Sequence, residues 1–65
     1  MKILVNGAWR DALARELSAV LEEFGYGGSI VTTAVNGEFV AAAARARTCL
    51  AEGDRLEVLA PMQGG

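Results

Sequence analysis

Hydrophobic and polar residues alternate in two segments at opposite ends of the chain, residues 1–6 and residues 55–60. Alternation with a period of two is typical of a strand that has one face buried. The hydrophobic residues that share a face in these two segments are Met1, Ile3, Val5, Leu56, Val58 and Ala60. We therefore expect a strand at each end of the chain.

Two Asn-Gly dipeptides predict tight hairpin turns, because Asn and Gly tolerate the positive φ angles of a two-residue turn better than other residues do. Asn6-Gly7 follows the first strand and predicts a second strand over residues 8–13. Asn36-Gly37 separates residues 30–35, which are rich in β-branched side chains, from residues 38–40. A second hairpin is expected there.

Between the two hairpins the spacing of the hydrophobic residues changes to that of a helix. The residues of this apolar stripe are Leu17, Val20, Leu21 and Phe24. Gly25 marks the end of the helix. Its start has two interpretations. Either the helix begins after about Arg15, or Asp11 caps its N-terminus and Leu13 extends the stripe, which would shorten the second strand.

The order of these elements predicts an α+β domain, with one main helix packed on one face of a mixed sheet of four to five strands. Residues 41–47 are rich in alanine and predict a short helical turn before the last strand. If the last strand pairs in parallel with the first, the connection must cross over through the helix, which is the β-grasp arrangement. We expect a single domain over residues 1–61 and a flexible C-terminal tail over residues 62–65.

The charge and hydropathy of the chain exclude several kinds of partner. The formal net charge is −2 and the pI is near 4.9, which is the wrong sign for binding the phosphate backbone of nucleic acids. The apolar runs are too short to span a membrane or to form a signal peptide. We therefore expect no nucleic acid partner, no membrane association and a cytoplasmic location.

The reactive side chains are too few for the usual catalytic and metal sites. The chain has no His and a single cysteine, Cys49. Zinc sites of four Cys and His ligands, and nucleophilic triads with a His base, are therefore excluded. We expect no catalysis, no metal and no cofactor bound by this chain. We interpret Cys49 as a buried or half-buried structural thiol, since a free Cys behaves mainly as a small hydrophobic residue.

The residues that follow Pro61 are Met62, Gln63, Gly64 and Gly65. Glycine has a high ordering cost, and two glycines directly after the last strand do not help the domain to fold. They form either an inert, frayed end or a slim strip that can be drawn into a narrow slot on another protein. In the second interpretation the reactive group is the main-chain carboxylate of Gly65.

Several sequence motifs together cover nearly the whole chain. They are Met1-Lys2-Ile3, Val5-Asn6-Gly7, the sequence of the predicted helix over residues 17–24, Ala34-Val35-Asn36-Gly37-Glu38, Gly53-Asp54 and the ending Gln63-Gly64-Gly65. With these motifs and this length, the chain resembles the sulfur-carrier branch of the ubiquitin-like proteins, the ThiS-type carriers of thiamin biosynthesis. Family members often place Pro-Arg and an aromatic residue after the fourth strand, where this chain has Ala41, Ala42 and Arg45.

The resemblance implies that this chain is a protein co-substrate on which partner enzymes act. A ThiF-type adenylyltransferase, which supplies ATP and metal, would adenylate the carboxylate of Gly65. A sulfur donor such as a cysteine desulfurase system would then give a thiocarboxylate, and a ThiG-type thiazole synthase would receive the sulfur. The tail would thread into the partner through Gly64, Gln63 and Met62. Gly64 has no side chain, which would let the nucleotide approach the tail closely.

A surface for docking partners is predicted on the open side of the sheet. On the alternation above, Leu4 and Leu59 point away from the buried face, and Ala34 extends the same apolar patch. The alternative is that these are isolated surface residues. Trp9 is either a rim residue that covers the sheet or a contact for a partner, since aromatic residues are enriched at interface hot spots.

Three other functions remain open from the sequence. The first is a thiocarboxylate carrier for another pathway, such as molybdopterin or amino-acid sulfur. The second is a β-grasp interaction module with an inert tail, and the third is a ubiquitin-like modifier. A carrier would show a thiocarboxylate fraction in its intact mass, an inert module only the carboxylate, and a modifier isopeptide conjugates to lysines.

Overall fold

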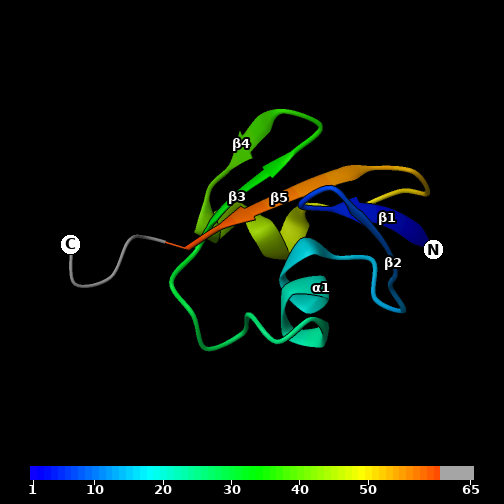
Figure 1. Cartoon of the computed structure of the whole chain (residues 1–65). Coiled ribbons are helices and arrows are strands. Elements are labelled where there is room, and N and C mark those ends of the chain that lie inside the picture. Colours follow the sequence, from blue (N-terminus) through cyan, green and yellow to red (C-terminus); the bar gives the residue numbers. More distant parts are fainter. Residues whose placement is uncertain (61–65) are drawn as a thin grey trace.

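The computed structural model describes residues 1–60 (Figure 1). In this part of the chain a single five-stranded sheet has the order β2-β1-β5-β3-β4. The strands are β1 (Lys2–Val5), β2 (Ala8–Asp11), β3 (Thr32–Val35), β4 (Glu38–Val40) and β5 (Arg55–Leu59). The helix α1 (Leu17–Glu23) packs under one face of the sheet, and a short 3₁₀ helix, η1 (Ala42–Arg47), follows β4.

The pairing of the strands gives the predicted β-grasp. β1 and β2 form one antiparallel hairpin, and β3 and β4 form the other. β5 lies between them, parallel to β1 and antiparallel to β3. The chain between the first hairpin and β5 contains α1, so the parallel pair is joined by a crossover through the helix, as expected. The predicted α+β class with one main helix is confirmed.

Both hairpin turns have the conformation that their sequences predict. Asn6 and Gly7 have φ angles of 49° and 84°, and Asn36 and Gly37 have φ angles of 50° and 83°. Two consecutive residues with positive φ form the turn whose twist matches that of the flanking strands. The Asn-Gly pairs therefore fix the register of the hairpins, with Val5 opposite Ala8 in the first.

The helix begins at Leu17 and ends at Glu23, and the alternative start at Asp11 is wrong because Asp11 is the last residue of β2. The predicted second strand is also too long. The backbone N–H groups of Leu13 and Ala14 donate to the Glu23 carboxylate, at 2.9 and 3.1 Å for the shortest bond of each. This side chain holds the chain in a loop after Asp11, where Leu13 is 95% exposed.

The same contacts change the acidity of Glu23. Its pKa is lowered from the ordinary value of 4.5, chiefly by the hydrogen bond from the Leu13 backbone N–H and then by that from Ala14. Both bonds favour the ionised carboxylate, and they outweigh the opposing effect of desolvation. The loop between β2 and α1 is therefore tied to the helix by a charged acceptor.

The hydrophobic core lies between the sheet and α1. Its residues are Ile3, Val5, Ala12, Leu17, Val20, Leu21, Val31, Leu50, Leu56 and Val58. Most of these were predicted from the two alternating segments and the helical stripe. Ala60 is an exception, since β5 ends at Leu59 and Ala60 is exposed. Ile30 was predicted to begin the third strand, but β3 begins only at Thr32, and Ile30 is 84% exposed.

One buried polar residue connects η1 to the sheet. Thr33 is fully buried, and its hydroxyl donates to the carbonyl of Val40 at 2.8 Å. The Arg45 guanidinium donates to the Thr33 hydroxyl through Nε at 3.1 Å and to the carbonyl of Val31 through Nη2 at 2.6 Å. Arg45 thus holds η1 against the start of β3 through hydrogen bonds that satisfy buried acceptors.

Among residues 1–60, no helix is both long and apolar enough to cross a membrane.

Candidate functional site

The face of the sheet opposite α1 is built from alternate residues of β1, β3, β4 and β5. Residues paired across a sheet point to the same face, and the observed pairs join Ala34 to both Phe39 and Glu57. Leu4 is paired with Arg55, two residues before Glu57, so Leu4 also lies on this side. These residues lie on the face opposite the core, as the alternation predicts.

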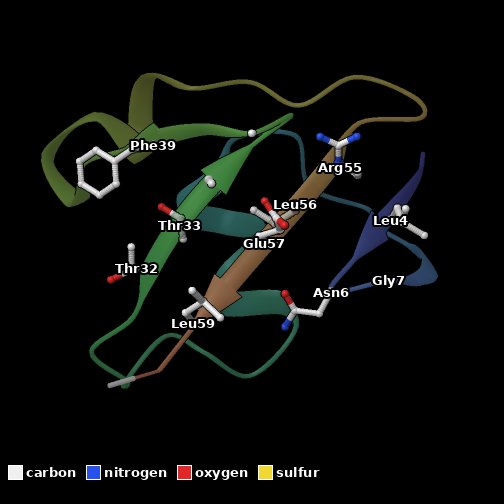
Figure 2. Close-up of a pocket in the computed structure, with 12 residues that line it drawn as sticks. Leu4, Asn6, Gly7, Thr32, Thr33, Phe39, Arg55, Leu56, Glu57 and Leu59 are labelled. Atoms are coloured by element: carbon white, nitrogen blue, oxygen red, sulfur yellow. The ribbon is translucent and has the colours of Figure 1, made fainter. Parts of the chain in front are cut away.

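The apolar part of this face is a patch of four side chains, which we call the open-face patch: Leu4, Ala34, Phe39 and Leu59. Phe39 is 71% exposed and Leu59 is 66% exposed, whereas Leu4 and Ala34 are half-buried. All four line one shallow hollow that runs across the sheet (Figure 2). The structure therefore brings the predicted residues Leu4, Ala34 and Leu59 together.

Phe39 was missed by the sequence prediction, although the sequence contains the signal. A two-residue turn at Asn36-Gly37 places Ala34 opposite Phe39 in the hairpin, as observed. Because Ala34 was assigned to the open side, Phe39 belongs there as well. It adds the largest exposed apolar side chain of the open-face patch, at the β4 edge of the sheet.

Two charged residues lie on β5 between the apolar side chains of the open-face patch. Arg55 and Glu57 are exposed and belong to the same alternation as Leu59. The hollow is thus apolar at both sides of the sheet and carries one positive and one negative side chain along its centre (Figure 2). A partner that covers it must offer apolar contact together with groups that pair with both charges.

Trp9 lies beside this surface on the edge strand β2. It is paired with Leu4, so its ring is on the open side of the sheet, and it is exposed. With Lys2, Glu52 and Gly53 it lines a second, smaller hollow. Both interpretations of Trp9, as a rim residue or as a partner contact, remain predictions.

Comparison with known proteins identifies the family. The sequence model of the ThiS family matches residues 3–65. The chain belongs to the ThiS family. It is accordingly a sulfur carrier in thiamin biosynthesis, and it interacts with partner enzymes of that pathway.

A solved structure supports the same assignment for this ThiS-family chain. The crystal structure of the thiamine biosynthesis protein ThiS from Geobacter metallireducens is similar over 100% of both chains, with 29% sequence identity and a TM-score of 0.82. No curated protein matches the chain. The agreement extends over the whole β-grasp and confirms the ubiquitin-like fold that the resemblance implies.

The predicted tail residues of the ThiS-family chain, Met62, Gln63, Gly64 and Gly65, lie outside the described residues. Their roles stay predictions, and so does the boundary between domain and tail at residue 61. What the structure does place is the element that leads to them. β5 ends at Leu59, so the last residue of the open-face patch is also the last strand residue before the tail.

Cys49 is exposed, and its prediction as a buried or half-buried thiol is wrong. It lies on a short segment that runs beside the start of α1, where Cys49 forms an isolated bridge with Glu16. The backbone N–H of Leu50 donates to the carbonyl of Arg15 at 2.8 Å, and Leu50 is buried. In this extended segment neighbouring side chains alternate, so burial of Leu50 directs Cys49 outward.

In residues 1–60, no group of three or more His, Cys, Asp or Glu side chains is arranged to hold a metal ion.

Proposed function

We propose that the carboxylate of Gly65 is the group on which this ThiS-family chain carries sulfur. In the first step, one carboxylate oxygen attacks the α-phosphorus of ATP, the bond to the β-phosphate breaks, and pyrophosphate leaves. The product is an acyl adenylate on Gly65. This activation is needed because a carboxylate is a poor electrophile, whereas AMP is a good leaving group.

In the second step a sulfur nucleophile attacks the activated carbonyl carbon and displaces AMP. With sulfide as the nucleophile, the product is a thiocarboxylate. A ThiG-type thiazole synthase passes the sulfur to its substrate: the C–S bond at Gly65 breaks, an oxygen atom of that substrate bonds to the same carbon, and the carboxylate of Gly65 is restored. The chain is therefore recycled as a co-substrate, and ATP, the metal ion and the catalytic groups belong to a ThiF-type adenylyltransferase and the other partner enzymes.

The observation that best supports this proposal is that the exposed apolar surface and the start of the tail meet at one residue. Leu59 belongs to the open-face patch, and Gly65 follows six residues later in the sequence. An extended chain of that length spans at most about 20 Å. A partner that covers the open-face patch therefore has Gly65 within about this distance of its edge. Gly64, Gln63 and Met62 thread into its slot.

The test is the intact mass of the chain after incubation with a ThiF-type adenylyltransferase, Mg-ATP and sulfide. The wild-type chain should gain the mass that corresponds to replacing one oxygen by sulfur, and a chain lacking Gly65 should gain none. Cys49→Ser is the matched control, because it removes the only thiol and should still be converted. A wild-type chain that keeps its original mass, or loss of conversion in the folded Cys49→Ser variant, contradicts the proposal.

A further inference from the structure

Asn6 makes contacts that its role in a turn does not require. Its side-chain Oδ1 accepts a hydrogen bond from the backbone N–H of Val58 at 2.8 Å, and its Nδ2 donates to the carbonyl of Val58 at 3.1 Å. Its own backbone N–H donates to the carbonyl of Leu56 at 3.0 Å. One residue of the first hairpin thus contacts β5 at two alternate residues, Leu56 and Val58.

These contacts extend the parallel pairing of β1 and β5 beyond the end of β1. The chain turns away from β5 at Asn6-Gly7, where φ becomes positive. The N–H and C=O of Val58 therefore have no continuing strand on the β1 side. A carboxamide carries one acceptor and one donor in the arrangement of a peptide group, so the Asn6 side chain replaces the missing strand. Figure 2 shows it beside the end of β5 that carries Leu59.

Asn36 provides a natural comparison at the other end of β5. It lies in the second Asn-Gly turn with nearly the same φ angle, 50° against 49° for Asn6. Its Oδ1 accepts a hydrogen bond from the Arg55 N–H at 2.9 Å, and its Nδ2 donates to Asp54 Oδ1 at 3.0 Å. The two asparagines thus hold opposite ends of the same strand, and only Asn6 holds the end that leads to the tail.

We infer that Asn6 is a positioning residue for the reaction at Gly65. It acts through Val58 and does not touch the reacting atoms. By holding Val58, it fixes the position and direction of β5 at Leu59, the strand residue that precedes the tail in the sequence. The inference rests on the proposed function, because it assigns a role to the same tail.

Loss of the Asn6 amide should affect association more than the chemical step. Without it, the end of β5 is held only by β3, and the residues there gain conformational freedom in the free protein. Docking must then order them again, which weakens binding. Once Gly65 is in the partner's slot, its surroundings are unchanged. We therefore expect a higher KM for the carrier and a nearly unchanged kcat.

The experiment compares Asn6→Gly with Asn36→Gly in the full chain. Glycine tolerates the positive φ angle at both positions, so each variant removes a side-chain amide without straining the turn. ATP–pyrophosphate exchange by a ThiF-type adenylyltransferase is measured against the concentration of the carrier. Asn6→Gly should raise KM about fivefold to tenfold, and Asn36→Gly should leave it within about twofold. Each variant removes two side-chain hydrogen bonds and should lose some thermal stability, and Asn6→Gly should lose more because the bonds of Asn6 are partly buried and those of Asn36 are exposed.

Hydrogen exchange of the Val58 amide gives a readout that does not depend on the enzyme. It should accelerate in Asn6→Gly and change little in Asn36→Gly. Asn6→Asp, which keeps an acceptor for the Val58 N–H but lacks the donor, should give an intermediate KM, and it carries the comparison if Asn6→Gly does not fold.

Equal KM values for the two glycine variants would overturn the positioning role while leaving the proposed function intact. The same holds if KM rises in both variants in proportion to their loss of stability. A wild-type chain that supports no exchange at all would overturn the proposed function, and the positioning role with it. The two failures are therefore distinguished by the behaviour of the wild-type chain alone.

Discussion

The two faces of the sheet are produced by the same alternating strands, yet they have opposite surroundings. On β5, Leu56 and Val58 are buried against α1, whereas Leu59 on the other face is 66% exposed. An apolar side chain that is buried within the domain stabilises the fold, and one that stays exposed can stabilise a complex only when a partner covers it. One face of this small domain therefore forms the core, whereas the other leaves apolar side chains exposed.

The largest effect is expected from a truncation on the packed face. Leu56→Ala removes a fully buried side chain from the centre of the sheet and should lower the free energy of unfolding by about 2–5 kcal/mol. For a domain of this size, such a loss is comparable to the whole stability. Thermal unfolding followed by circular dichroism measures it, and a cooperative transition at the wild-type Tm would contradict the description of the core.

A smaller loss is expected where a polar contact supports the packed face. Arg45→Ala leaves the buried Val31 carbonyl without its guanidinium donor and should cost about 1–3 kcal/mol of unfolding free energy. Arg47→Ala is the matched control, since within residues 1–60 Arg47 makes a single long, exposed side-chain bond of 3.4 Å to the Ala43 carbonyl. Chemical denaturation should separate the two variants. Equal midpoints would show that Arg45 does not hold η1 against β3.

On the open face the effect should appear in binding and not in folding. Leu59→Ala should leave the Tm nearly unchanged and weaken binding to a ThiF-type adenylyltransferase about tenfold, which is about 1.4 kcal/mol and typical of the minority of interface residues that contribute measurably to affinity. Leu13→Ala is the control, because Leu13 is equally apolar and 95% exposed but lies in the loop before α1. Isothermal titration calorimetry of both variants tests the difference. If binding weakens equally in both variants, or in neither, the open-face patch does not contact the adenylyltransferase.

The smallest effect concerns a charge outside both faces. The pKa of Glu23 is lowered in the folded chain, so its contribution to stability is full above the ordinary value of 4.5 and is lost as the pH falls through the folded pKa. Glu23→Gln should therefore lower the Tm slightly at neutral pH. The difference should shrink under more acidic conditions. A Tm difference that is the same across this pH range would show that the charge of Glu23 is not involved.

Much of the fold was predictable because its determinants are local in the sequence. The two Asn-Gly turns are each specified by two residues, and the helical stripe from Leu17 to Phe24 by a spacing that only a helix satisfies. The parallel pairing of β1 with β5 was left as a condition from the sequence, because the order of elements shows only that such a pairing needs a crossover, and the structure shows that it forms. The open-face positions of Leu4, Ala34 and Leu59 followed from alternation alone.

The parts that were missed depend on contacts between distant segments. Cys49 is exposed because its neighbour Leu50 is buried next to the start of α1, a pairing of residues about thirty positions apart that periodicity does not reveal. β2 ends before Leu13 because the backbone N–H of Leu13 donates a hydrogen bond to the Glu23 carboxylate. The Asn6 side chain was interpreted only as a turn residue, and its bonds to Val58, 52 positions later, become visible only in the folded chain.

In the proposed function, sulfur is carried on the main-chain carboxyl of Gly65, and the folded domain supplies the surface for docking. The most direct measurement is fragmentation mass spectrometry of the chain isolated from cells that are making thiazole. A fraction of the molecules should have one oxygen of the Gly65 carboxyl replaced by sulfur. Sulfur found on Cys49, or only unmodified carboxylate during active thiazole synthesis, would contradict it.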